Sequence, residues 1–288
     1  MQTTRPTARF GELAADEWGA PDHRPTLVLM HGLTFDRQMW HATVAVLQEI
    51  DPGRHVLAVD LPGHGESAAS INPRLGDGGR AIADGLQLRG IVAPVLVGHS
   101  AAAVDATFYS AEYPVSGIVN VDTPLQVEGF ATMLRQLAAR YDRDYPAMWH
   151  DVLLPSLRIA QLPEPAQRLL AAHSTPTRDV LAAGWDEVLD RPVAELDQRM
   201  QSALARLRES ATPYVTVFGD EPPPGYLPWL AAHLPQARVE IWPGHAHFPQ
   251  LADTERFARV LAATADWSAP PPDAQVNTSG KGKIEPDG

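Results

Sequence analysis

Short, almost wholly apolar runs recur along the chain, and most are bounded by glycine, proline or a charged residue. Runs of this length and composition are typical of parallel strands that are buried on both faces of a sheet. We therefore predict strands at residues 27–30, 55–60, 92–97, 117–122, 214–219 and 238–242. Residues 7–19 alternate between apolar and polar positions, which predicts an opening β-hairpin.

Segments between these runs carry apolar residues at helical spacing. They predict helices at residues 77–89, 101–112, 228–233 and 253–266. Strands that alternate with helices along a chain are typical of the α/β class. The pattern therefore predicts a mostly parallel twisted sheet that is flanked by helices.

The pattern changes completely between residues 123 and 211. Apolar residues recur there at helical spacing, as at Phe130, Leu134, Leu137 and Tyr141, and several prolines divide the segment into short helices. Strand-like runs resume after it, so we interpret the segment as a helical insertion rather than an independent helical domain.

Length and composition bound the class of protein. A length of 288 residues suits one large α/β domain with an insertion, and the 44% of hydrophobic residues are ample for its core. The net charge of −12 argues against nucleic acid or an anionic membrane as partner. The absence of cysteine excludes disulfides, thiol nucleophiles and cysteine-based metal sites.

The two ends of the sequence carry no apolar targeting or spanning signal. The first residues lack the apolar stretch of a signal peptide, and no run reaches the roughly 20 apolar residues that cross a bilayer. We expect a cytoplasmic protein. Residues 268–288 are rich in proline, glycine and polar residues, which predicts a disordered C-terminal tail.

The most informative motif is Gly98-His99-Ser100-Ala101-Ala102, directly after one predicted strand and before a predicted helix. A sharp strand-to-helix turn needs small residues two positions before and after its apex, and Gly98 and Ala102 satisfy this. Such a turn presents the serine hydroxyl above the edge of the sheet. Ser100 is therefore the candidate nucleophile, and the alternative is a serine that merely caps a helix.

Further motifs surround this turn in a fixed order. His31-Gly32 ends the first apolar run, a Leu-Pro-Gly-His-Gly-Glu-Ser loop occupies residues 61–67, and a His-Ala-His-Phe-Pro segment occupies residues 245–249. In this order the sequence resembles the α/β-hydrolase fold family over residues 7–265. The resemblance implies a core formed by residues 1–122 and 212–267, and a helical lid formed by residues 123–211.

The resemblance places the general base in the loop after the last strand. Both His245 and His247 lie there, and Ala246-His247-Phe248-Pro249 fits the family register better. We therefore predict His247 as the base and keep His245 as the alternative. A metal site on this His-x-His pair is the least favoured interpretation because no carboxylate partners are evident, and we predict neither metal nor cofactor.

The acidic partner of the base has three candidates. Many members of the family carry it after the strand that follows the lid, where this chain has Asp220 and Glu221 in an altered register. Other members place it after the strand that precedes the lid, and Asp122 matches that arrangement. We favour Asp122, with Glu221 ahead of Asp220 as alternatives. Asp122 could instead cap the first turn of the insertion.

The resemblance also implies two oxyanion donors and a pocket. The backbone N–H groups of Leu33 and Ala101 are the expected donors. Trp149 and Trp185, in the insertion, are candidate substrate contacts, although most aromatic residues at helical spacing form the core of the insertion.

A serine nucleophile indicates acyl chemistry rather than the carboxylate-based chemistry of haloalkane dehalogenases. We expect hydrolysis of an apolar carboxylic ester or lactone through an acyl-serine intermediate. An acyltransferase with the same residues, and a catalytically idle ligand-binding protein, remain alternatives. Whether the protein forms a homodimer is left open by the sequence.

Overall fold

The computed structural model describes residues 5–68 and 77–268. Within these residues eight strands form one sheet in the order β1-β2-β4-β3-β5-β6-β7-β8. The strands are β1 (Arg5–Phe10), β2 (Leu13–Trp18), β3 (Leu27–Met30), β4 (Val56–Val59), β5 (Val95–His99), β6 (Gly117–Val121), β7 (Tyr214–Phe218) and β8 (Arg238–Ile241).

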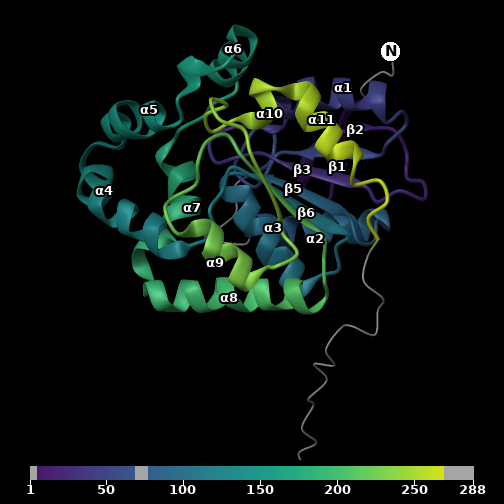
Figure 1. Cartoon of the computed structure of the whole chain (residues 1–288). Helices are drawn as coiled ribbons and strands as arrows, with labels where there is room; N and C mark the ends of the chain where they lie inside the picture. Colours follow the sequence, from purple (N-terminus) through teal and green to yellow (C-terminus); the bar gives the residue numbers. More distant parts are fainter. Residues whose placement is uncertain (1–4, 69–76, 269–288) are drawn as a thin grey trace, which may run out of the picture.

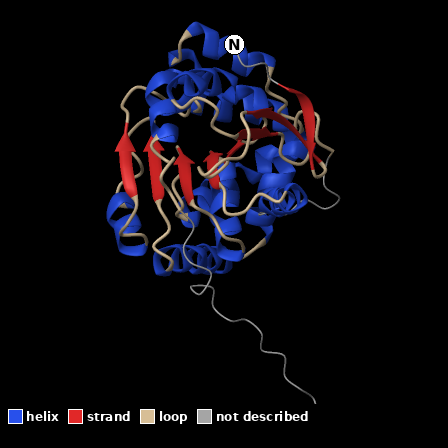
Figure 2. Cartoon of the chain, turned by 90° about the vertical axis from the view of Figure 1, so that its right-hand side faces the viewer, coloured by secondary structure: helices blue, strands red, loops and turns tan. Residues whose placement is uncertain are grey.

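The sheet is mostly parallel, as the sequence predicts. Strands β1 and β2 form the expected antiparallel hairpin, and β2 pairs antiparallel with β4. All pairs from β4 to β8 are parallel. The arrows of the parallel strands accordingly point the same way in Figure 2. Their carboxyl ends therefore meet at one edge of the sheet.

Helices cover both faces of the sheet (Figure 1). The helices outside the β6–β7 connection are α1 (His41–Ile50), α2 (Asp77–Arg89), α3 (Ala101–Glu112), α9 (Tyr226–His233), α10 (Pro249–Ala252) and α11 (Thr254–Ala262), with a 3₁₀ turn η1 (Arg37–Trp40). The predicted helix at residues 253–266 is shorter: α11 begins at Thr254, with Asp253 as its side-chain cap, and ends at Ala262, after which residues 263–266 form turns.

Alternate residues of each central strand feed two separate apolar cores. Val28, Met30 and Leu96 pack on the side of α2 and α3, whereas Leu27, Leu29 and Val97 pack on the side of α1 and α11. This division follows from the two-residue period of a strand. Burial on both faces explains why the strand sequences are almost wholly apolar.

The connection between β6 and β7 is helical. It contains α4 (Val127–Met148), a π-helical turn η2 (Trp149–Leu153), α5 (Leu154–Ser156), a 3₁₀ turn η3 (Ile159–Gln161), α6 (Glu164–Ala172), α7 (Arg178–Asp190) and α8 (Val193–Glu209). Helices α4, α5 and α7 lie on the left of Figure 1, and α6 lies at its top. The predicted tail at residues 268–288 lies outside the described residues from residue 269 onward.

Candidate active site

Ser100 occupies a sharp turn between β5 and α3, with φ 54° and ψ −127°. A non-glycine residue at positive φ is uncommon and costs about 1–3 kcal/mol, so surrounding contacts must hold it there. The Ser100 N–H donates to the Val121 carbonyl at 3.0 Å, and the Thr123 hydroxyl donates to the Ser100 carbonyl at 2.8 Å. The turn is thus held against the end of β6.

Glycines make room for this turn. A Cβ added to Gly98 would lie 2.4 Å from the Ala102 carbonyl oxygen, so only glycine fits there. A Cβ added to Gly32 would lie 3.2 Å from the Ser100 Cβ. The backbone of the loop that follows β3 therefore lies directly against the serine.

Asp122 and His247 come together although 125 positions separate them in the sequence. Asp122 follows β6 at a φ of 57°, and its N–H donates to the Val217 carbonyl at 2.8 Å. One carboxylate oxygen, Oδ1, accepts the Gly219 N–H at 2.7 Å, and Oδ2 lies 2.7 Å from His247 Nδ1. Strands β6 and β7 therefore fix the carboxylate, and the carboxylate orients the imidazole.

This pairing determines what the imidazole can do. An ionised carboxylate only accepts hydrogen bonds, so His247 Nδ1 donates and Nε2 of the neutral ring remains an acceptor. The His247 side chain is 21% exposed and that of Asp122 is 17% exposed. A partly exposed imidazole with a fixed tautomer, whose second nitrogen is basic, can take up a proton from a neighbouring hydroxyl.

The alternative residues lie elsewhere. Asp220 forms an ion pair with Arg158 and accepts the Gly244 N–H at 3.1 Å through Oδ1. Glu221 is exposed. The ring of His245 contacts the Pro243 carbonyl through Nδ1 at 3.3 Å and packs edge-on against Trp242. Among the described residues, Asp122 is the carboxylate that contacts His247.

The loop after β3 is held by two buried histidines. His31 Nδ1 donates to the Gly32 carbonyl at 2.8 Å, and His31 Nε2 accepts the Leu61 N–H at 3.0 Å. His64 Nε2 accepts the Thr34 N–H at 3.2 Å. Burial lowers the pKa of both histidines, which keeps them neutral in these roles.

The position of the Gly32 carbonyl sets the direction of the next N–H. This carbonyl also accepts the Phe35 N–H at 3.2 Å. In a trans peptide the carbonyl and the following N–H point in opposite directions, so the Leu33 N–H points away from His31. The Ala101 N–H belongs to the first turn of α3, where N–H groups have no acceptor within the helix.

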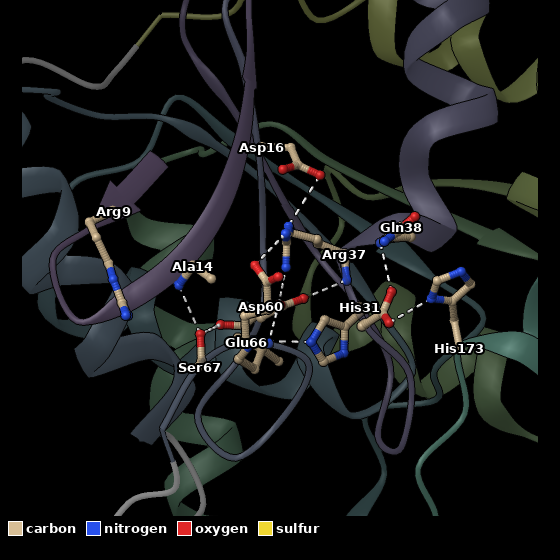
Figure 3. Close-up of polar contacts among 12 residues, drawn as sticks. Arg9, Ala14, Asp16, His31, Arg37, Gln38, Asp60, Glu66, Ser67 and His173 are labelled. Carbon is tan, nitrogen blue, oxygen red and sulfur yellow. Dashed lines mark hydrogen bonds and ion pairs between the residues drawn. The ribbon is translucent and has the colours of Figure 1, made fainter. Parts of the chain in front are cut away.

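An ionic cluster around the buried Arg37 and Asp60 adjoins this loop (Figure 3). The Arg37 guanidinium pairs with Asp60, with Asp16 at 3.1 Å and with Glu66 at 2.8 Å. Its backbone N–H also donates to Asp60 Oδ1 at 2.8 Å, so the carboxylate holds both the main chain and the side chain of Arg37. Nearby, the Ser67 hydroxyl joins the Ala14 N–H to the Asp60 carbonyl. The cluster fixes η1, and with it the loop, to β2 and to the loop after β4.

The helical connection reaches the same loop. The Leu33 side chain packs against an apolar cluster of α4, η2, α7 and α8, to which Trp149 and Trp185 belong. Both tryptophans are 6% exposed and form part of the core of these helices; their contact with a substrate stays a prediction. After α6, His173 Nδ1 lies 2.8 Å from Asp36 Oδ2, and the Thr175 N–H donates to the Thr34 carbonyl.

Two contacts near the site escape sequence reasoning. One is the bond between His99 Nε2 and the His247 carbonyl, at 2.8 Å. The other is the His173–Asp36 pair. Each joins residues more than 130 positions apart, and only the folded chain brings them together.

The described residues contain neither a metal-binding cluster nor a membrane-spanning helix. In the described part of the chain, no three His, Cys, Asp or Glu side chains come together in a way that could bind a metal ion. Nor does any described helix combine the length and apolarity needed to cross a membrane.

Known proteins share this architecture. Among solved structures, Est816, described as an N-acyl homoserine lactone degrading enzyme, superposes with a TM-score of 0.68 at 18% identity, over 90% of this chain and 99% of its own. An esterase from Thermogutta terrifontis gives a TM-score of 0.64 at 21% identity, over 91% and 97% of the two chains. At these identities the likeness concerns the fold alone.

Sequence relatives extend along most of the chain. A 2-succinyl-6-hydroxy-2,4-cyclohexadiene-1-carboxylate synthase from Serratia proteamaculans is 27% identical, over 83% of this chain and 92% of the relative. A pimeloyl-[acyl-carrier protein] methyl ester esterase from Vibrio atlanticus is also 27% identical, over 86% and 97%. The model of the alpha/beta hydrolase family matches residues 27–260. With this match, the fold and the predicted order of motifs, the chain belongs to the alpha/beta hydrolase family.

Proposed function

We propose that the protein hydrolyses a carboxylic ester or lactone through an acyl-serine intermediate. Ser100 is the nucleophile, His247 the general base and Asp122 the acid that orients the base. The observation that carries this proposal is the 2.7 Å contact between Asp122 and His247, at the sheet edge where Ser100 occupies its positive-φ turn. This combination of a hydroxyl, an imidazole and an orienting carboxylate suits acyl transfer.

The reaction has two balanced halves. Ser100 Oγ attacks the carbonyl carbon while His247 Nε2 takes the hydroxyl proton, and the imidazolium then returns that proton to the departing alkoxide. In the second half, water loses a proton to His247 and attacks the acyl-serine. The carboxylic acid then leaves and the proton returns to Ser100 Oγ. In a lactone the alkoxide and the acyl group belong to one molecule.

The negative oxygen of the tetrahedral intermediate needs hydrogen-bond donors. The Leu33 and Ala101 N–H groups are the proposed pair, since the first points away from His31 and the second opens α3. Each donor of this kind contributes about 10²–10³ in rate. The N-terminal end of α3 adds a favourable dipole for the anion.

We assign an apolar acyl group to the substrate and a lid role to the helical connection. Leu33, one proposed donor, packs on the apolar cluster of that connection. An acyl group that is bound beside the oxyanion loop would thus meet aliphatic and aromatic side chains. The named activity of one sequence relative, a methyl ester esterase, fits the same substrate class.

The test is hydrolysis of p-nitrophenyl esters and γ-lactones of increasing acyl length, together with labelling by a fluorophosphonate. We expect turnover, covalent label on Ser100 by peptide mass spectrometry, and loss of both in Ser100→Ala. An unlabelled Ser100 with no product would indicate a catalytically idle binding protein. Acyl transfer to an added alcohol that exceeds hydrolysis at every concentration tested would indicate a transferase.

A further inference from the structure

His99 immediately precedes the proposed nucleophile and is completely buried. Its Nε2 lies 2.8 Å from the His247 carbonyl oxygen. Its ring centroid lies 4.8 Å from that of His247 and 5.0 Å from that of Phe248. The residue beside the nucleophile therefore touches both the main chain and the ring of the base.

The partners of His99 determine where its proton resides. A carbonyl oxygen only accepts, so Nε2 must carry the hydrogen. Nδ1 is buried without a hydrogen-bond partner among the described residues, and it lies 2.5 Å from where a Cβ on Gly32 would be. Burial, with His247 as a second cause, lowers the pKa of His99 well below its usual range. The ring is thus a neutral donor with one tautomer.

The loop that carries His247 needs this kind of support. Ala246, just before the base, is a non-glycine residue at a φ of 53°. The His245 N–H donates to the Gly219 carbonyl at 3.0 Å, which holds the start of the loop, and Asp122 holds the ring of His247. The bond from His99 holds the main chain immediately after the imidazole.

We propose that His99 is a positioning residue for the reaction, whose Nε2–H fixes the main chain of His247 relative to Ser100. Because His99 and Ser100 are consecutive, the bond joins the turn of the nucleophile directly to the loop of the base. Transfer of a proton between hydroxyl and imidazole requires their separation to be correct to a fraction of an ångström. The proposal rests on the proposed function of Ser100 and His247.

The experiment compares substitutions that keep or remove the donor. His99→Phe keeps an aromatic ring without the N–H, and His99→Gln keeps an N–H at similar reach without the ring. One sample of each enzyme is titrated with a fluorophosphonate to count competent sites. The rate of acylation by a p-nitrophenyl ester is measured on an untreated sample and divided by that count. This normalisation separates positioning from loss of folded protein.

We expect the acylation rate per site to fall about 10–100-fold in His99→Phe, because a small displacement of a catalytic group has effects of this size. KM should change little, and His99→Gln should recover most of the rate. His55→Phe is the matched control, since His55 is also buried but bonds to Thr26 and Glu17 away from the site. Its rate per site should equal that of the wild type.

Each outcome separates the two proposals. A wild type that is neither labelled nor active overturns the proposed function. An active wild type with an equal rate per site in His99→Phe overturns the role of His99. So does a His99→Gln enzyme as slow as His99→Phe, since ring packing would then explain the loss. If His99→Phe does not fold, His99→Met and His99→Gln provide a ring-free pair that differs in the donor.

Discussion

At the scale of residues, the site depends on a few side chains whose hydrogen bonds fix their orientation and their tautomer. The Asp122 carboxylate has one oxygen on a backbone N–H and the other on His247. His31, His64 and His99 each bond to main-chain groups of the loops around Ser100. These contacts fix the tautomers and the orientations of the side chains. The same residues on mobile loops would not be held in this way.

The assignment of the acid is tested by removing one charge at a time. Asp122→Asn should lower kcat on a p-nitrophenyl ester by about 10³–10⁴, because the amide no longer selects the required imidazole tautomer. Glu221→Gln and Asp220→Asn are the controls and should retain most activity, since Glu221 is exposed and Asp220 pairs with Arg158. A larger loss in either control than in Asp122→Asn would move the acid to the β7 loop.

At the scale of elements, the site is formed where strands end. The loops after β3, β5, β6, β7 and β8 all contribute a residue or a main-chain group. Parallel pairing places these carboxyl ends along one edge, the usual location of ligand sites in open α/β sheets. Hydrogen bonds between neighbouring loops then hold these strand ends in place, and Gly219, in the loop after β7, takes part in two of these bonds.

Gly219 lies where the loop after β7 packs closely against the loop of His247. Its N–H donates to Asp122, its carbonyl accepts from His245, and a Cβ would lie 1.7 Å from the Ala246 carbonyl oxygen. Gly219→Ala should displace the base loop, lower kcat at least about tenfold and destabilise the fold by about 1–3 kcal/mol. Kinetics and urea unfolding measure both.

The control for this substitution is Gly129→Ala in α4, where an added Cβ meets no atom within 4 Å. It should leave kcat unchanged and the free energy of unfolding equal or slightly higher, since alanine favours a helix more than glycine does. Wild-type kcat and stability in Gly219→Ala would contradict the tight approach of the two loops.

The buried Arg37 joins η1 to β2 and to the loop after β4 through its carboxylate partners. Arg37→Met should lower the free energy of unfolding by about 3–5 kcal/mol, because it leaves buried carboxylates without a counter-charge. Arg168→Met, at an exposed pair with Glu164, should change it by less than about 0.5 kcal/mol. Equal small effects in urea unfolding would show that the cluster is not needed for stability.

Much of the element-level picture follows from the sequence, for reasons that differ between elements. Most buried parallel strands and the α2 and α3 helices have a strong local pattern, and their predicted bounds agree with the structure to within one residue. The strand predicted at residues 92–97 differs, since it begins at Val95, after Pro94, and extends to His99. The helix predicted at residues 253–266 begins as expected beside its cap Asp253 but ends at Ala262, where turns replace the last predicted residues. The contacts of His99, Asp36 and Arg37 could not be predicted, since they depend on how distant loops meet.

At the scale of the whole molecule, stability is linked to histidines that folding keeps neutral. Burial lowers the pKa of His31, His55, His64 and His99 below 6.5. Below about pH 6.5 the unfolded chain protonates these groups while the folded protein does not. The unfolded state then binds more protons, so the free energy of unfolding must fall as the pH falls.

We therefore expect stability to be constant above about pH 7 and to decrease toward pH 5.5, by up to about 1.4 kcal/mol per pH unit for each such histidine. Urea unfolding at pH 7.5, 6.5 and 5.5 measures this slope. His55→Gln should reduce the slope, whereas His23→Gln, at an exposed position, should not. A free energy of unfolding that is constant or rises over this range would contradict neutral buried rings.

Ser100, Asp122 and Ala246 all have positive φ although none is glycine. Three of the seven described non-glycine residues at positive φ therefore lie in turns that the proposed chemistry uses. A protein engineer who seeks heat tolerance would be drawn to these positions first, because glycine there relieves strain. Ala246→Gly would also free the loop that presents the imidazole. Thermal stability and turnover therefore place opposite demands on these three positions.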